Sequence, residues 1–125
     1  MSEFATRELA GAAVIRAAGR LDALVSPELD QAISQVVDGG QVRLVVDCSD
    51  VSYISSSCLR VLLLGARRTR EQGGDLKLCC LSERVQQIFA LAGFDLVFDL
   101  CPSEDEAVAA FVTSPTGPQL PCPPA

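Results

Sequence analysis

Apolar segments of two kinds alternate along the chain from residue 26 to residue 112, and this alternation constrains the fold more than any other feature. In one kind the apolar residues recur at helical spacing, and in the other they form short, nearly continuous runs typical of buried strands. Helices are predicted at 26–38, 56–72, 82–92 and 103–112, and strands at 42–48, 75–81 and 96–100. This order predicts a largely parallel sheet with right-handed crossovers.

The two ends of the chain complete this picture. The stretch from Glu8 to Leu21 predicts a hairpin or strand pair that turns near Gly11, which would make the sheet mixed. We therefore expect an α/β fold with about five strands packed against four helices, in one domain spanning residues 1–112. Residues 113–125 are rich in proline and predict an extended or disordered tail. At the first helix, Ser26 is the expected cap and is followed by proline.

Composition excludes several classes of function. A formal net charge of −6 argues against binding to nucleic-acid phosphates. No apolar run approaches the roughly 18 residues that span a bilayer, and no secretory signal is visible, so we expect a cytoplasmic protein. The chain has no histidine, which rules out a Ser-His-Asp site, and no glycine-rich phosphate loop follows the first strand. We expect neither an enzyme nor a cofactor.

The six cysteines invite a search for metal or redox chemistry. None forms a C-x-x-C pair, so a zinc site is not expected. Cys79 and Cys80 adjoin on a predicted strand, and we expect them to point to opposite faces and not to chelate together. Most of the cysteines are interpreted as small core residues kept reduced. A redox role stays open for Cys58, because a helix N-terminus lowers the pKa of a thiol.

Three serines, Ser55, Ser56 and Ser57, stand at the predicted start of the second helix. Backbone N–H groups there lack intrahelical partners, and the helix dipole is positive. A serine in this position can cap the helix, bind an anion or accept a phosphate. The residues alone leave these three roles open.

Three motifs carry a resemblance to a known family. They are Gly19–Asp22 followed by a Ser-Pro-Glu helix start, Leu44–Leu59, and Gly73–Leu78 followed by Val85–Gly93. In their order and spacing they resemble the STAS domain of bacterial anti-sigma factor antagonists. The match covers roughly residues 8 to 112 and implies the STAS fold.

The resemblance implies a partner-switching function in the regulation of transcription. By position, Ser57 would be phosphorylated by an anti-sigma factor that is itself a serine kinase and binds the ATP. The unphosphorylated antagonist would bind this partner and release a sigma factor, and a phosphatase would reset the switch. Partner contacts are expected at Asp22, Ser55, Ser56, Cys58 and Leu59. Asp22 is equally explained as a turn residue that bonds its own backbone.

The chain departs from the family motif at two positions. Ser55 replaces the usual acid and Cys58 replaces the usual glycine. These changes leave open that Ser55 or Ser56 accepts the phosphate, or that the serines only cap the helix. The alternative function is a STAS adaptor or scaffold subunit without a phospho-switch, in a transporter accessory role or a stress-signalling complex.

Overall fold

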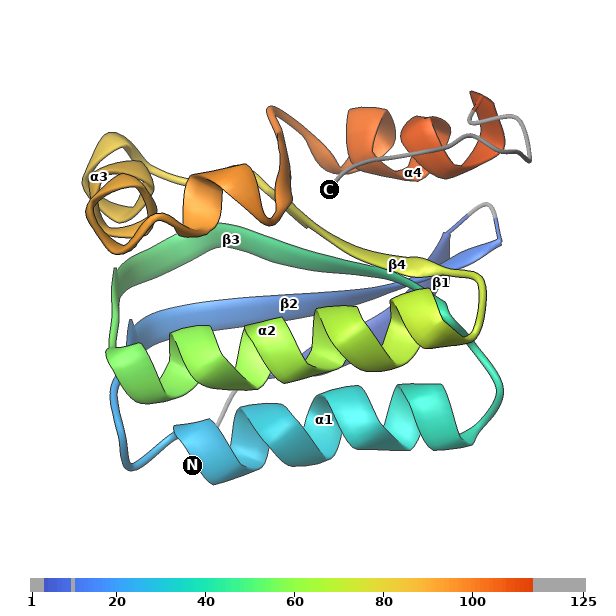
Figure 1. Cartoon of the computed structure of the whole chain (residues 1–125), viewed down its shortest axis with the longest axis horizontal. Coiled ribbons are helices and arrows are strands. Elements are labelled where there is room, and N and C mark those ends of the chain that lie inside the picture. Colours follow the sequence, from blue (N-terminus) through green and yellow to red (C-terminus); the bar gives the residue numbers. More distant parts are fainter. Residues whose placement is uncertain (1–3, 10, 114–125) are drawn as a thin grey trace.

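The computed structural model describes residues 4–9 and 11–113. Their strands form one five-stranded sheet in the order β1-β2-β3-β4-β5, covered by helices as the sequence predicts (Figure 1). The elements are β1 (Ala5–Leu9), β2 (Ala12–Leu21), α1 (Ser26–Asp38), β3 (Arg43–Ile54), α2 (Ser56–Glu71), β4 (Asp75–Cys79), α3 (Glu83–Ala92), the 3-10 helix η1 (Phe94–Leu96), β5 (Asp99–Cys101) and α4 (Glu104–Thr113). The rest of the expected tail, residues 114–125, lies outside the described residues.

The sheet is mixed and mostly parallel, as expected. β1 and β2 form the predicted antiparallel hairpin, whereas β2, β3, β4 and β5 pair in parallel. Because each crossover returns the chain to the same end of the sheet, α1 and α2 begin at one end of the molecule and run side by side (Figure 1). The C-terminal ends of β2 and β3 lie at this same end.

The two faces of the sheet are packed differently. Alternate residues of β3 point to opposite faces. Leu44 and Val46 enter the main core with α1, α2 and α3, whereas Val45 faces α4. The main core also holds Leu29 and Ile33 from α1. The face under α4 has a smaller apolar cluster and also carries buried polar groups, Asp47 and Lys77. Among the described residues, no helix has the length and apolarity needed to cross a bilayer.

Strand β3 is longer than predicted. Residues 49 to 53, expected to be a loop, continue the strand to Ile54. They stay extended because they keep pairing with β2, through Ala18↔Asp50 and on to Leu21↔Ile54, despite two shifts of register. Val51 and Ile54 are buried by this pairing. The strand therefore delivers the chain directly to the start of α2, without an intervening loop.

Two local predictions were wrong. Ser26 does not cap α1, because the helix already includes it: Val25 holds the cap position and the Ser26 hydroxyl donates to the carbonyl of Ala23 at 3.0 Å. The last strand is not 96–100, because Gly93 adopts a left-handed φ of 77° and leads into η1 before the strand forms. By contrast, the helix predicted from residue 82 does begin with a serine cap, because the Ser82 hydroxyl accepts the backbone N–H of Val85 at 3.2 Å.

The expectation for Cys79 and Cys80 was also wrong. β4 ends at Cys79, and Cys80 has a left-handed φ of 64°, so the strict alternation of a strand stops between them. Both sulfurs and a carboxylate oxygen of Asp47 lie within 4.8 Å of one another. Adjacent cysteines that a regular strand would separate thus share one side of the sheet.

The glycine pair before β4 yields a graded prediction. A Cβ on Gly74 would lie 1.9 Å from the carbonyl oxygen of Val42, whereas a Cβ on Gly73, at φ 88°, would meet nothing within 4 Å. We expect Gly73→Ala to cost about 1–2 kcal/mol from its left-handed conformation alone. Gly74→Ala should cost about 3 kcal/mol or more, because backbone must move. Urea unfolding of both variants checks this order, and equal losses would contradict it.

Candidate functional site

The start of α2 is built on the end of β3. Ser55 is extended, with φ −88° and ψ 166°, and its hydroxyl oxygen accepts the backbone N–H of Cys58 at 3.3 Å. This is the geometry of an N-cap, and it satisfies one of the helix's unpaired donors. Ser56 and Ser57 then form the first turn, with Ser56 exposed and Ser57 half-buried. The predicted helix start is therefore confirmed, and Ser55 is its cap.

The loop between β2 and α1 is held against this helix start by two contacts. The backbone N–H of Ser55 donates to the carbonyl of Leu21 at 2.8 Å, and the thiol of Cys58 donates to the carbonyl of Asp22 at 3.4 Å. Asp22 also accepts the backbone N–H of Leu24 on its carboxylate at 3.1 Å. Asp22 is thus a turn-forming residue whose half-buried side chain lies beside the serines.

Burial divides the site residues into two groups. Cys58 is 0% exposed and Leu59 is 5% exposed, so both side chains belong to the main core. Burial raises the pKa of the Cys58 thiol above its ordinary value, although the hydrogen bond with Ser55 acts in the opposite direction. The lowered pKa expected from the helix N-terminus is therefore not present. A buried thiol with a raised pKa gives no support to a redox role of Cys58.

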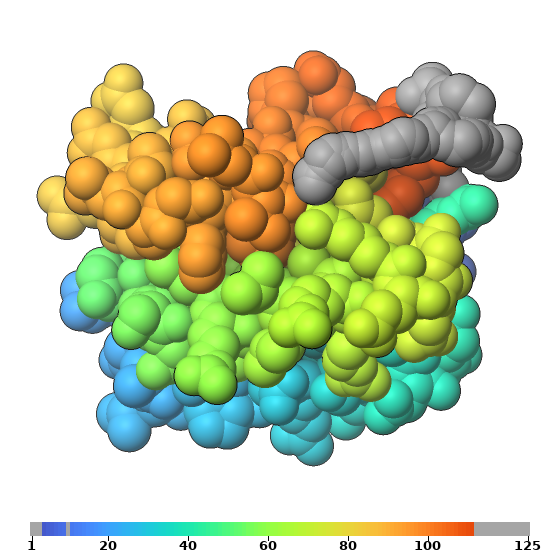
Figure 2. Space-filling model, viewed as in Figure 1, coloured from blue at the N-terminus to red at the C-terminus, as the bar shows by residue number. Residues whose placement is uncertain are grey.

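An exposed apolar side chain stands in the loop that is bonded to the start of α2. Leu24 is 84% exposed in the β2–α1 loop, two residues beyond the carbonyl that holds Cys58. Figure 2 shows this end of the molecule at the left edge, where the blue β2–α1 region and the green start of α2 meet. Nothing in the sequence pattern marked Leu24 as a site residue, because single exposed leucines are common. Its position becomes apparent only once the loop is placed.

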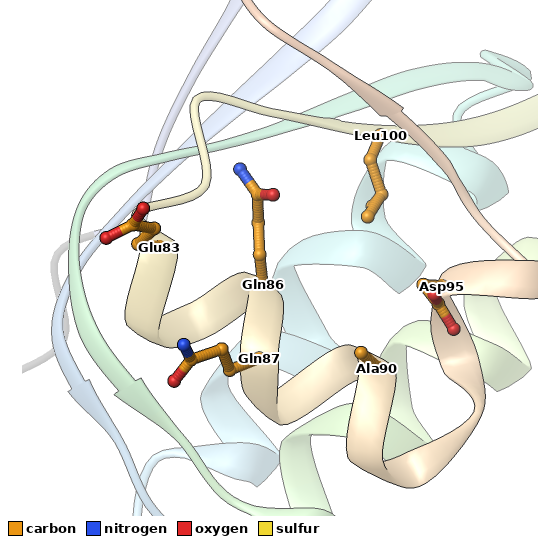
Figure 3. Close-up of a pocket in the computed structure, with 6 residues that line it drawn as sticks. All are labelled: Glu83, Gln86, Gln87, Ala90, Asp95 and Leu100. Atoms are coloured by element: carbon orange, nitrogen blue, oxygen red, sulfur yellow. The ribbon is translucent and has the colours of Figure 1, made fainter.

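A pocket elsewhere does not compete with this site. It lies between α3 and the segment that carries η1 and β5, and its side chains are drawn in Figure 3. Gln86 and Leu100 project into the space between these elements, and Glu83 and Asp95 lie at its margin. These lining residues include two carboxylates but no cation, serine or cysteine.

Comparisons with known proteins agree with the geometry. A profile of the STAS domain matches residues 3–107. BtrV of Bordetella bronchiseptica, assigned as an anti-sigma factor antagonist, is 36% identical over 96 residues, which cover 77% of this chain and 83% of BtrV. The anti-sigma-B factor antagonist of Bacillus subtilis is 30% identical over 94 residues, covering 75% and 85% of the two chains.

A solved structure extends the comparison to three dimensions. An anti-sigma factor antagonist from Mycobacterium paratuberculosis superposes with a TM-score of 0.75 at 28% identity. The match covers 87% of this chain and 92% of the other. The arrangement of the sheet and helices is therefore shared along nearly the whole of both proteins.

The cap at the start of α2 can be tested by substitution. We expect Ser55→Ala to lower the free energy of unfolding by about 1 kcal/mol, because the N–H of Cys58 loses its acceptor. Ser55→Asp should retain stability, since a carboxylate both caps and favours the positive helix end. Ser56→Ala, in the exposed first turn, is the matched control and should change little. Equal losses for Ser55→Ala and Ser56→Ala in denaturant unfolding would contradict this assignment.

Proposed function

The chain belongs to the STAS domain family and to its anti-sigma factor antagonists, and from this premise we propose that it is a phosphorylation-controlled antagonist. Members of this family bind anti-sigma factors in partner switching and act as regulators rather than catalysts. In the proposal, the unphosphorylated chain binds an anti-sigma factor with serine kinase activity, which carries the ATP. Binding releases a sigma factor. Phosphorylation of Ser57 ends the binding, and a phosphatase restores it.

The surface around the α2 start supports this proposal. Ser56 and Ser57 lie beside the β2–α1 loop, because Ser55 bonds to the last residue of β2 and Cys58 bonds to the first residue of that loop. A partner that reaches Ser57 therefore meets Asp22 and Leu24 at the same time. An apolar anchor with polar groups around it is the usual composition of a protein interface.

The observation that carries the proposal is the inward direction of the Cys58 side chain. A side chain in place of the family's glycine would obstruct a kinase if it stood beside Ser57 on the surface. Here it is fully buried, and its thiol donates to the carbonyl of Asp22. Together with Leu59, the Cys58 side chain packs in the core beneath the serines. We therefore propose that Cys58 and Leu59 position the contact surface, while Ser55, Ser56 and Asp22 contribute to contacts above it.

The electrostatics of a phosphate at Ser57 favour control of binding over refolding. A phosphoserine adds about −1.5 to −2 charges at pH 7. At a helix N-terminus the dipole stabilises such a charge by about 0.3–1 kcal/mol, so the fold tolerates it. Across an interface, one like-charge contact at about 4 Å with an effective dielectric of about 20 costs on the order of 4 kcal/mol. That corresponds to roughly a thousandfold loss of affinity.

Phosphorylation is tested directly by mass. The protein is incubated with ATP and a kinase-type anti-sigma factor from the same genome, and the intact mass is recorded. We expect a gain of one phosphate, which Ser57→Ala abolishes. Ser55→Ala and Ser56→Ala are the matched controls and should still be modified. The phosphorylated protein should bind the anti-sigma factor about a thousandfold more weakly in calorimetry.

Two outcomes oppose the assignment. Modification that persists in Ser57→Ala and disappears in Ser55→Ala or Ser56→Ala would move the acceptor to the neighbouring serine. Tight binding to the kinase without any gain of phosphate would instead favour the adaptor function without a switch. The replacement of the family's acid by Ser55 is the feature that favours this second function.

The proposed interface makes a further prediction for Leu24. Truncation by Leu24→Ala should weaken binding to the anti-sigma factor by about 1–2 kcal/mol, or roughly tenfold, because an exposed leucine is buried in the complex. Leu96→Ala is the matched control, since Leu96 is 87% exposed but lies on η1. Calorimetric titration compares the two variants. Equal effects would show that Leu24 lies outside the interface.

A further inference from the structure

A group of ligand-type side chains lies on the face of the sheet that α4 covers, separate from the α2 start. Asp47 of β3 stands directly opposite Cys79 of β4 in the register of the parallel pair. Cys80 follows at once, and one donor atom from each of the three residues lies within 4.8 Å of the other two. Asp47 and Cys79 are buried, and Cys80 is half-buried.

The backbone of Cys80 is what completes this group. Its φ of 64° makes it the non-glycine residue with positive φ among the described residues. Such a conformation costs roughly 1–2 kcal/mol for a residue with a side chain, and natural proteins concentrate this strain at functional positions. The left-handed backbone of Cys80 brings two neighbouring thiols and a carboxylate together.

Asp47 is a buried carboxylate that the surrounding side chains do not neutralise directly. It is 5% exposed and forms no ion pair within residues 4–9 and 11–113. The cation across the strand, Arg16, pairs with Asp50 at 2.8 Å instead. Asp47 accepts the backbone N–H of Ser49 at 2.8 Å, and the carboxyl group of Glu104 lies close to it. A buried carboxylate beside two thiols favours a cation as the missing partner.

We propose that Asp47, Cys79 and Cys80 bind a thiophilic divalent cation of the zinc class, with Glu104 as the fourth side chain. Zinc accepts thiolate and carboxylate ligands together, whereas magnesium and calcium prefer oxygen alone. With zinc–sulfur bonds of about 2.3 Å, tetrahedral sulfurs lie about 3.8 Å apart. The donor atoms of Asp47, Cys79 and Cys80 lie within 4.8 Å of one another, so small side-chain movements bring these three to that spacing.

The surroundings of the cluster resemble the outer ligand shell of a metal site. The amide of Ser49 orients the Asp47 carboxylate, and Arg7 of β1 forms an ion pair with Glu104. Such outer contacts fix ligand orientation in metalloproteins. Glu104 opens α4, so a bound cation would link the start of this helix to the middle of β3 and the end of β4. This proposal is independent of the phosphorylation at Ser57.

Cobalt(II) is a suitable probe, because thiolate ligands give it a charge-transfer absorption in the ultraviolet. The reduced full-length protein is titrated with Co²⁺ in a non-thiol reductant, and Zn²⁺ is then added. We expect one equivalent of Co²⁺ per chain, a thiolate band, and displacement by Zn²⁺. Cys80→Gly should abolish the band while folding well, because glycine tolerates a left-handed φ. Asp47→Asn should weaken Co²⁺ binding at least about tenfold.

Cysteines outside the cluster supply matched controls. Cys48→Ala removes a buried thiol on the opposite face of the sheet, and Cys101→Ala removes a half-buried thiol on the neighbouring strand β5. Both variants should retain the band with unchanged stoichiometry. Circular dichroism confirms the fold of each variant, and Cys80→Ala serves as a second substitution at the same position. Absence of a thiolate band in the parent protein, or its survival in folded Cys80→Gly and Cys80→Ala, overturns the proposal.

Discussion

The parallel pairing of β2 and β3 positions the helices and loops around it. It runs from Ala13↔Leu44 to Leu21↔Ile54, and it therefore brings both strands to their ends at one place. The loop after β2 and the helix after β3 start side by side as a direct consequence. The hydrogen bond from Ser55 to the carbonyl of Leu21 closes this junction. Without this register of β2 and β3, the serines would form an ordinary helix start with no β2–α1 loop beside it.

At this junction the Cys58 side chain is buried, whereas Leu24 in the adjoining loop is exposed. Cys58 contributes no surface, but its thiol holds the carbonyl of Asp22 and so couples the loop to the first turn of α2. A glycine at this position would offer no such contact. The cysteine that replaces the family's glycine is thus accommodated inside the core. Ser57 remains half-buried at the surface, with Leu24 exposed nearby.

Periodicity predicted the helices and most of the sheet, because burial on one face leaves a regular trace in the sequence. The misses have specific causes. Residues 49 to 53 look like a polar loop, yet cross-strand pairing keeps them extended. Ser26 has the composition of a cap but lies inside the helix. At the site, Asp22 and the serines were expected from motifs, whereas Leu24 carried no signal of its own.

Local spacing, and motifs in a fixed order, were enough to predict the α/β alternation, the start of α2 and the family. The directions of individual side chains depend instead on how the elements pack. The direction of Cys58 depends on the loop packed against it, and the meeting of Cys79, Cys80 and Asp47 depends on one left-handed residue and on strand register. Such contacts join residues far apart in the chain, and local patterns contain no record of them.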